Sequence, residues 1–496
     1  MVVIAILKIV NLYTILNMKK SFQFLIIFLF VATNTFSQAK KWTLEECENY
    51  ALKNNISVKQ SEIDARNSLI SKNAAFGNFL PTINASNTHS WNIGLNQNVT
   101  TGILENQTQQ NSSIGLNSGV TLYNGLQNQN RLRSANLSII ASQFQISKMK
   151  DDIALNVANA FLQILFNKEN VKIQNEQANN TSRQLARTEE LVAAGSIPRG
   201  DLLDVKATLA GNDQNKVVAE NALFISKLSL AQLLQLSDFA TFDISETLPT
   251  EAGNSVIMLE TPENILKKAT ENRFEVKIAK VNLDIAEKEI LIAKGAYQPR
   301  LSAFYSFSTR AGFSERIVGF QPNLNNPFST IGVVQGTNQQ VVQPNFSPIL
   351  GNAAPVFDQF SDFKGHSFGL QLNIPILNGF SVKNNVERTK VALDRNKINL
   401  QQTELELERN VYNAYANASG AKNAFESAKI ALVARQNAVD YAKERFAVGM
   451  MNSFDYNQSQ SLLANAQSEV IRTKYDYIFK IKIIELYFGI PIVATK

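Results

Sequence analysis

The chain has 496 residues, of which 45% are hydrophobic and 18% charged, so it can bury a core and is long enough for more than one domain. Its formal charge of +6 includes Lys8, Lys19 and Lys20, and the residues after position 37 carry 6 − 3 = +3 with no basic stripe, which argues against a nucleic-acid partner. The single cysteine, Cys47, excludes an internal disulfide and is expected at an apolar helix position.

Residues 1–37 have the layout of a secretory signal peptide. A basic start at Met18-Lys19-Lys20 precedes an apolar run over 21–32, and small residues end the run near Ser37. Because the signal restarts at Met18, we interpret this methionine as the true start. After the leader, no uncharged apolar run reaches the ~18 residues that a membrane-spanning helix needs. Any membrane-spanning part would therefore consist of β-strands.

The first half of the chain predicts helix, strand, strand, long helix and helix. Thr43 is the expected N-cap of a helix that runs to about Ala75, and Glu46 completes a capping box. Alternating apolar and polar residues predict strands over 80–94 and 114–122, joined by a polar loop over 96–112. The remaining predicted elements are a helix over 127–192, a turn at Gly195, a helix over 201–236 and a linker over 237–259.

The second half repeats this order at two fixed offsets. Pro81 and Pro299 precede equivalent strands and differ by 299 − 81 = 218 residues, whereas Asn124-Gly125 and Asn378-Gly379 differ by 378 − 124 = 254. The predicted elements are a helix over 262–293, strands over 301–307 and 368–376 around an exposed loop over 308–364, and helices over 381–447 and 453–488. The chain is thus a duplicated helix-strand-strand-long helix-helix unit, with repeats over 38–236 and 260–496.

The turn between the last two helices of each repeat is also duplicated. Gly195 and Gly449 are 449 − 195 = 254 residues apart, and an aspartate follows each after six residues, at Asp201 and Asp455. As a helix, the ~70 residues from Gly125 to Gly195 would span on the order of 100 Å, which is a coiled-coil or helical-barrel dimension. Four strands cannot close a barrel alone, and a membrane requires every strand edge to be paired, so several copies would have to share one barrel.

This arrangement resembles the TolC-type outer-membrane efflux proteins, also called outer membrane factors, over essentially the whole mature chain. The resemblance rests on the paired prolines, the paired Asn-Gly sequences and the two tips in duplicated order. It implies a mainly α fold with a membrane β-barrel portion: a homotrimer with a twelve-stranded β-barrel in outer-membrane lipid and an α-helical barrel in the periplasm. It also implies a passive exit duct for efflux or type I secretion, docked by a periplasmic adaptor (membrane fusion) protein and powered by an inner-membrane pump of the RND or ABC type.

The resemblance also assigns roles at the tips. The implied adaptor-docking residues are Gly195, Ser196, Ile197, Val448, Gly449 and Met450. The implied gate residues are Asp201, Asp204 and Arg199 in the first tip and Asp455 in the second. Better-known members of the family carry an arginine and a further aspartate where this chain has Met451 and Gln458, so the gate charge is expected mainly in the first repeat. The alternative is that Asp201 and Asp455 are first-turn acids that favour the helix dipole.

The sequence contains no pattern that marks catalysis. His89 and His366 lie near predicted strands without cysteine or carboxylate neighbours at metal-ligand spacing. No nucleophile elbow, phosphate loop or dinucleotide fingerprint is present, so we expect neither an enzyme nor a cofactor. The alternative to a conduit is a secreted coiled-coil structural or surface protein without a pore, and the four amphipathic strands argue against it.

Overall fold

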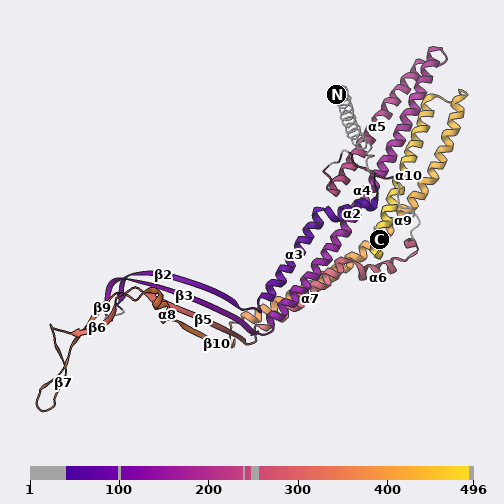
Figure 1. The fold of residues 1–496 in the computed structure, drawn as a ribbon. Coiled ribbons are helices and arrows are strands. Elements are labelled where there is room, and N and C mark those ends of the chain that lie inside the picture. The colour runs from indigo at the N-terminus through magenta and orange to yellow at the C-terminus, as the bar shows by residue number, and fades with distance from the viewer. Residues whose placement is uncertain (1–40, 99–101, 238, 240, 247–255, 491–496) are drawn as a thin grey trace, which may run out of the picture. The chain divides into compact units, whose positions relative to one another are not determined.

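The structure is a computed structural model, and it describes residues 41–98, 102–237, 239, 241–246 and 256–490. The predicted leader lies outside the described residues. The chain divides into two compact units (Figure 1). Of the described residues, the helical unit comprises those within 41–65, 141–280 and 399–490, and the sheet unit comprises those within 66–140 and 281–398.

The first repeat contains two short helices, a hairpin and two long helices. Thr43 caps the first helix through the predicted capping box with Glu46. The elements are β1 (Lys41–Trp42), α2 (Leu44–Asn54), α3 (Ile56–Gly77), β2 (Thr82–Gln97), β3 (Leu104–Asn124), α4 (Gln127–Ala193), α5 (Arg199–Leu234) and β4 (Asp243–Ile244). The strands are longer than predicted, and most of the expected polar loop over 96–112 belongs to them. Backbone ladder bonds pair these mainly polar residues whatever their side chains, so alternation of polarity is not required.

The second repeat has the same order with a longer excursion between its strands. Its first and last elements are η1 (Val256–Leu259), α6 (Pro262–Asn272), α7 (Phe274–Gly295), β5 (Arg300–Gly312), β10 (Gly365–Asn373), α9 (Ser381–Ala447) and α10 (Ser453–Phe488). The bounds of α9 and α10 confirm the prediction. The exposed loop expected over 308–364 is wrong in part, because it contains β6 (Arg316–Pro322), β7 (Phe328–Val333), β8 (Gln340–Pro344), β9 (Phe346–Gly351) and α8 (Val356–Asp362).

Two helices that the sequence predicts as continuous are each interrupted once. The breaks fall at Asn55, between α2 and α3, and at Arg273, between α6 and α7. Both residues leave the helical region, with ψ of 134° and 132°, while their N–H groups still bond to Ala51 and Ala269. Neither break is marked by proline or glycine, so the sequence pattern runs through them without a stop signal.

The helical unit has two hydrophobic clusters, one built mainly by the first repeat with Ile478 of α10 and one built by the second repeat. The first cluster surrounds Phe161 and Ile164 of α4 and Leu230 of α5, all of which are fully buried. The second surrounds Val411 and Ala418 of α9 together with residues of α10. Alanines recur at the buried positions of α9, and their small side chains let neighbouring helices approach closely. Cys47 is buried in the first cluster as expected, and burial raises the pKa of its thiol to about 12.

The linker predicted over 237–259 is partly ordered in the described residues. Within it β4 pairs in parallel with β1, a long-range contact between two-residue strands that no sequence periodicity reveals. By length and composition, α5 is the one helix among the described residues that could cross a membrane, with a mean hydropathy of 1.3 over its best window. Glu220 and Lys227 interrupt this apolar stretch. It therefore contains no uncharged apolar run of the length that a membrane-spanning helix needs, as expected.

Candidate functional site

The four central strands form one sheet with chemically different faces. The strand order is β10-β5-β3-β2, and all neighbours are antiparallel. Directly opposed residues share a face. One such row contains Ala85, Leu116, Phe307 and His366, and the adjacent row on the other face contains Asn84, Asn117, Ser306 and Ser367. The predicted apolar faces are therefore confirmed over most of their length and combine into one apolar surface. The prediction fails at two ends: β10 stops at Asn373, before Ile374 and Ile376, and Leu122 lies at a shift of the pairing register between β3 and β5.

The polar face is neutral over its central part. Ser306 Oγ donates to Asn117 Oδ1 at 2.7 Å, which confirms that these two strands present the same face. The aromatic residues Trp91, Tyr305 and Phe307 lie on the apolar face, where the pairing register places them with Ile83 and its neighbours. Among the described residues, β2 and β10 end the strand order, so the sheet has an apolar face, a polar face and two open edges.

The two hairpin turns have the same backbone geometry. Gly195 and Gly449 follow α4 and α9 with φ of +72° and +75°, the left-handed conformation that favours glycine. The Ser196 N–H donates to the Leu191 carbonyl at 2.9 Å, and the Met450 N–H donates to the Arg445 carbonyl at 2.8 Å. The two hydrogen bonds end α4 and α9 in the same way, so the tip predicted from sequence is a duplicated structure. Both turns lie at the same end of the helical unit (Figure 1).

The acids and amides predicted for the gate are accessible. Asp201 is half-buried in the first turn of α5, and Asp204 and Arg199 are exposed. In the second tip Asp455 and Gln458 are exposed and Met451 is half-buried. Within the described part of the chain, neither aspartate of the first tip forms an ion pair with Arg199. Accordingly, a single copy presents these side chains at the turns without an ion pair between Arg199 and the two aspartates of the first tip.

The docking residues predicted at the turns lie on the surface. Gly195, Ser196, Val448, Gly449 and Met450 are exposed, and Ile197 is half-buried. Met450 and Val448 are 69% and 71% exposed, which leaves two apolar side chains in contact with solvent at the second tip.

The helix starts at the two tips differ. Asn452 caps α10, and its side-chain oxygen accepts a hydrogen bond from the Asp455 N–H at 2.8 Å. Pro198 occupies the equivalent place before α5 and provides no side-chain cap. Phe446 and Tyr456 also stack across the second turn, with ring centroids 4.9 Å apart. The second tip is consequently held by more side-chain contacts than the first.

Ion pairs that the sequence analysis missed join the linker to the helices. Lys168 is nearly buried and lies 2.8 Å from Asp243, which also pairs with Lys227 at 2.9 Å. The Lys168 ammonium donates to the Ile244 carbonyl at 2.9 Å as well. Burial alone would raise the pKa of the Asp243 carboxyl, but the hydrogen bonds from the two lysines hold it below its usual value. This cluster attaches β4 to α4 and α5.

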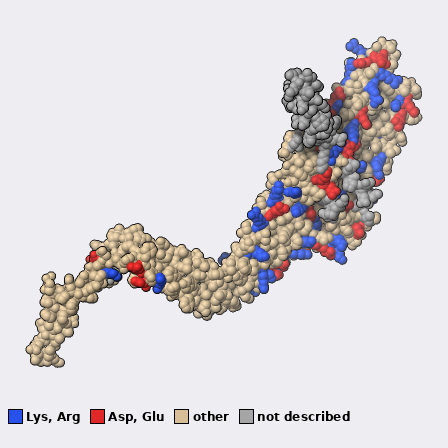
Figure 2. Space-filling view, viewed as in Figure 1, with Lys and Arg blue, Asp and Glu red and all other residues tan. Residues whose placement is uncertain are grey.

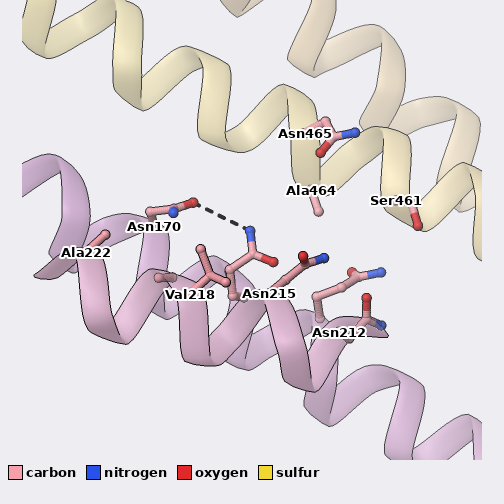
Figure 3. A pocket seen from close by; sticks show the side chains of 11 residues that line it. Asn170, Asn212, Asn215, Val218, Ala222, Ser461, Ala464 and Asn465 are labelled. Atoms are coloured by element: carbon pink, nitrogen blue, oxygen red, sulfur yellow. Dashed lines mark hydrogen bonds between the residues drawn. The ribbon is translucent and has the colours of Figure 1, made fainter. Parts of the chain in front are cut away.

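A cleft of about 290 Å³ opens between α4, α5 and α10 within the helical unit (Figure 3). Its walls carry the amides of Asn170, Gln174, Gln177, Asn212, Asn215 and Asn465 and no charged group. Nearer the tips, both polar side-chain atoms of Gln184 and of Asn457 are buried, and among the described residues neither side chain has a hydrogen-bond partner. Unsatisfied buried amides stabilise packing less than apolar side chains do. The helices are therefore less tightly held here than in the two hydrophobic clusters.

The comparisons with known proteins agree with this geometry. The family model "Outer membrane efflux protein" matches residues 49–235 and 358–480. The TolC outer membrane protein of Vibrio cholerae is 22% identical over 342 residues, which cover 68% of this chain and 67% of TolC. The solved structure of CusC has a TM-score of 0.71 at 14% identity, covering 90% of this chain and 91% of CusC. The CmeC outer membrane channel of Campylobacter jejuni has a TM-score of 0.70 at 17% identity, covering 90% and 85%.

The chain belongs to the outer membrane efflux protein family, which the two matched ranges establish over more than half of its length. It is an outer-membrane protein with the mainly α, partly β fold of TolC-like channels, as predicted. Members of this family are channels rather than enzymes. Among the described residues no group of three or more His, Cys, Asp or Glu side chains could hold a metal ion.

Proposed function

We propose that the protein is the outer-membrane exit duct of a tripartite efflux or type I secretion system and acts as a passive channel. The observation that supports this most directly is the sheet with one apolar face, one polar face and two open edges. Three copies would join β10 of one copy to β2 of the next and give a closed barrel of twelve strands. The apolar face would meet outer-membrane lipid and the polar face would line the lumen.

In this proposal the chain is organised as the sequence predicts. Residues 1–37 are a leader with its true start at Met18, the repeats cover 38–236 and 260–496, and residues 237–259 form an equatorial segment between them. Each repeat contributes two strands to the barrel and one long hairpin to a periplasmic helical barrel.

The hairpin tips are the proposed gate. Three copies would bring six turns together, and Asp201, Asp204 and Asp455 would form acidic rings with Arg199 beside the first. Rings of carboxylates in a narrow neck attract cations and repel anions. The unsatisfied amides of Gln184 and Asn457 support movement of the tips, because they hold the nearby helices weakly. Met451 and Gln458 carry no charge, so the gate charge comes mainly from the first repeat.

The proposed partners are two further copies of the chain, a periplasmic adaptor protein and an inner-membrane pump of the RND or ABC type. The exposed turns at 195–197 and 448–450 would dock the adaptor, with Val448 and Met450 as apolar contacts. A Met450→Glu substitution is expected to weaken adaptor binding, which a pull-down with the purified adaptor would measure. Equal binding by the variant would remove Met450 from the docking surface.

Conductance of purified protein in planar bilayers tests the duct and its gate together. The wild-type protein is expected to migrate as a heat-sensitive trimer and to form pores. Asp201→Ala combined with Asp455→Ala is expected to raise the conductance or to lower cation selectivity, because the tip acids restrict the closed end. Asp213→Ala, an exposed acid further along α5, is the matched control and should behave as wild type.

Two results would contradict the proposal at different levels. Absence of pores even in the double variant would favour the alternative, a coiled-coil structural or surface protein. Pores with unchanged conductance and selectivity would leave Asp201 and Asp455 as acids that favour the helix dipole and would remove them from the gate.

A further inference from the structure

The two repeats differ most in the segment that joins their paired strands. In the first repeat residues 98–103 connect β2 to β3, whereas in the second repeat residues 313–364 connect β5 to β10. The longer segment contains two consecutive two-stranded pairs, β6 with β9 and β7 with β8, which together we call the ribbon (residues 316–351). The ribbon lies between the two ranges that match the family model.

The ribbon is apolar and, apart from Arg316 at its start, uncharged. No charged residue occurs between Arg316 and Asp358. On the face shown in Figure 2, this end of the sheet unit carries no charged atoms beyond the few near α8. Thirteen large apolar residues of the ribbon are each at least 40% exposed: Ile317, Val318, Phe320, Leu324, Phe328, Ile331, Val333, Val334, Val341, Val342, Phe346, Ile349 and Leu350. An exposed apolar surface of this extent marks an interaction site.

Neither water nor lipid is a suitable environment for this ribbon. Each pair of strands forms its own two-stranded sheet among the described residues, so backbone N–H and C=O groups remain on the outer edges. Two strands are marginally stable in water, and the charged residues that normally protect exposed edges are missing here. In hydrocarbon the unpaired edge groups would each cost several kcal/mol. A protein surface is the environment that satisfies both the side chains and the edges.

The position of the ribbon in the sheet unit indicates which protein surface it meets. The ribbon begins just after β5 and leads back to β10, which is the edge strand of the sheet. In the proposed trimer, that edge pairs with β2 of the next copy. The β2–β3 hairpin of each copy extends past β5, because β3 pairs with β2 from Leu104 but with β5 only from Asn111. Its projecting end exposes Ile93 and Leu95, at 82% and 66%.

We propose that the ribbon of one copy packs against the projecting β2–β3 end of the next copy, so that three such contacts form an apolar collar at the end of the shared sheet. This inference rests on the proposed trimeric duct. The collar covers the apolar side chains of the ribbon and those of Ile93 and Leu95 with one another. It also explains why the ribbon lacks charges, since a buried charge without a partner would weaken the contact.

Photo-crosslinking in intact cells tests the collar. A photoreactive phenylalanine analogue at Ile331 is expected to give, on illumination, a covalent product of two copies that mass spectrometry maps to the β2–β3 hairpin. The same analogue at Ser86, on the edge strand β2, tests independently whether β2 of one copy pairs with β10 of the next, a contact that we call the seam. Product at Ser86 but none at Ile331 would overturn the collar while leaving the duct intact. No crosslinked product at either position would contradict both the shared sheet and the collar.

Two further outcomes distinguish a neighbouring copy of the chain from lipid or another protein as the surface that the ribbon contacts. A product between Ile331 and lipid, or between Ile331 and a different protein, would overturn the proposal even if the Ser86 seam forms. As a second measurement, Ile331→Lys is expected to lower the temperature at which the trimer dissociates in detergent, because it places a charge in the contact.

Discussion

Asn55 and Arg273 occupy equivalent positions of the two repeats, 273 − 55 = 218 residues apart, and both interrupt a helix with the same backbone geometry. The means of holding the break differ. The Asn55 amide donates to the Leu233 carbonyl at 3.0 Å and accepts from the Ser57 N–H at 2.9 Å. Arg273 is nearly buried and pairs with Asp151 at 3.0 Å and Glu275 at 3.2 Å. Duplication has thus kept the backbone while the interactions that stabilise it have diverged.

The same divergence appears at the fifth residue of each of the two short helices α2 and α6. Thr43 and Thr261 are equivalent N-caps, and Glu48 in α2 corresponds to Leu266 in α6 by the same offset of 218. Glu48 is fully buried, and neither of its carboxyl oxygens has a hydrogen-bond partner among the described residues. Burial raises the pKa of the Glu48 carboxyl to about 8, although Lys482 of α10 opposes the shift. The first repeat therefore carries an ionisable group where the second has simple apolar packing.

The largest effect is expected from removing the ionic break. Arg273→Met leaves Asp151 and Glu275 without their cation, and burial already raises the pKa of the Asp151 carboxyl. Loss of one partner of a buried ion pair costs about 3–5 kcal/mol. Chemical unfolding followed by circular dichroism would measure this loss. Lys390→Met, which breaks the exposed pair with Glu387, is the control and should change the unfolding free energy by less than ~1 kcal/mol.

Replacing Glu48 by the residue of the second repeat is expected to change the pH dependence of stability. The folded protein binds the Glu48 proton more tightly than the unfolded chain, so this stabilisation is complete below the usual pKa of 4.5 and is lost as pH rises towards 8. Glu48→Leu should remove that decline and stabilise the protein at pH 8 by a few kcal/mol, roughly 1.4 kcal/mol per pKa unit. Parallel unfolding curves for both proteins between pH 5 and 8 would contradict the assignment.

A smaller effect is expected at the neutral break. Asn55→Ala removes the hydrogen bond to Leu233 and the cap on the Ser57 N–H, which together contribute about 1–2 kcal/mol. Chemical unfolding followed by circular dichroism, under the conditions used for Arg273→Met, would compare the two losses. A loss as large as that of Arg273→Met would show that the backbone break, and not its ionic partners, determines the stability.

The smallest effect is expected at the tips. Asn452→Ala removes the cap that the second tip has and the first lacks, at a cost of about 1 kcal/mol. Hydrogen exchange of the first-turn amides of α10 should become faster, approaching that of α5 after Pro198. Unchanged exchange would mean that the stacking of Phe446 on Tyr456 suffices to hold the second tip.

The sequence by itself determined the elements that carry local signals. The limits of α9 and α10 follow from caps, glycines and helical periodicity, and the two tips follow from Gly195 and Gly449 at a shared offset. The apolar faces of the strands could be predicted because a two-residue period survives any arrangement of neighbours. The candidate tip residues could be located for a different reason, because Gly195 and Gly449 mark the turns on which they lie.

Only the tertiary structure decided the features that depend on distant partners. The breaks at Asn55 and Arg273 are stabilised by Leu233 and by Asp151, far away in sequence, so no local stop signal was needed. The pairing of β1 with β4 and the pairing within the ribbon involve strands that are too short, or that alternate too little between apolar and polar residues, to show a two-residue period. Backbone hydrogen bonds form these strand pairs whatever their side chains are, so the polarity pattern of the sequence does not reveal them.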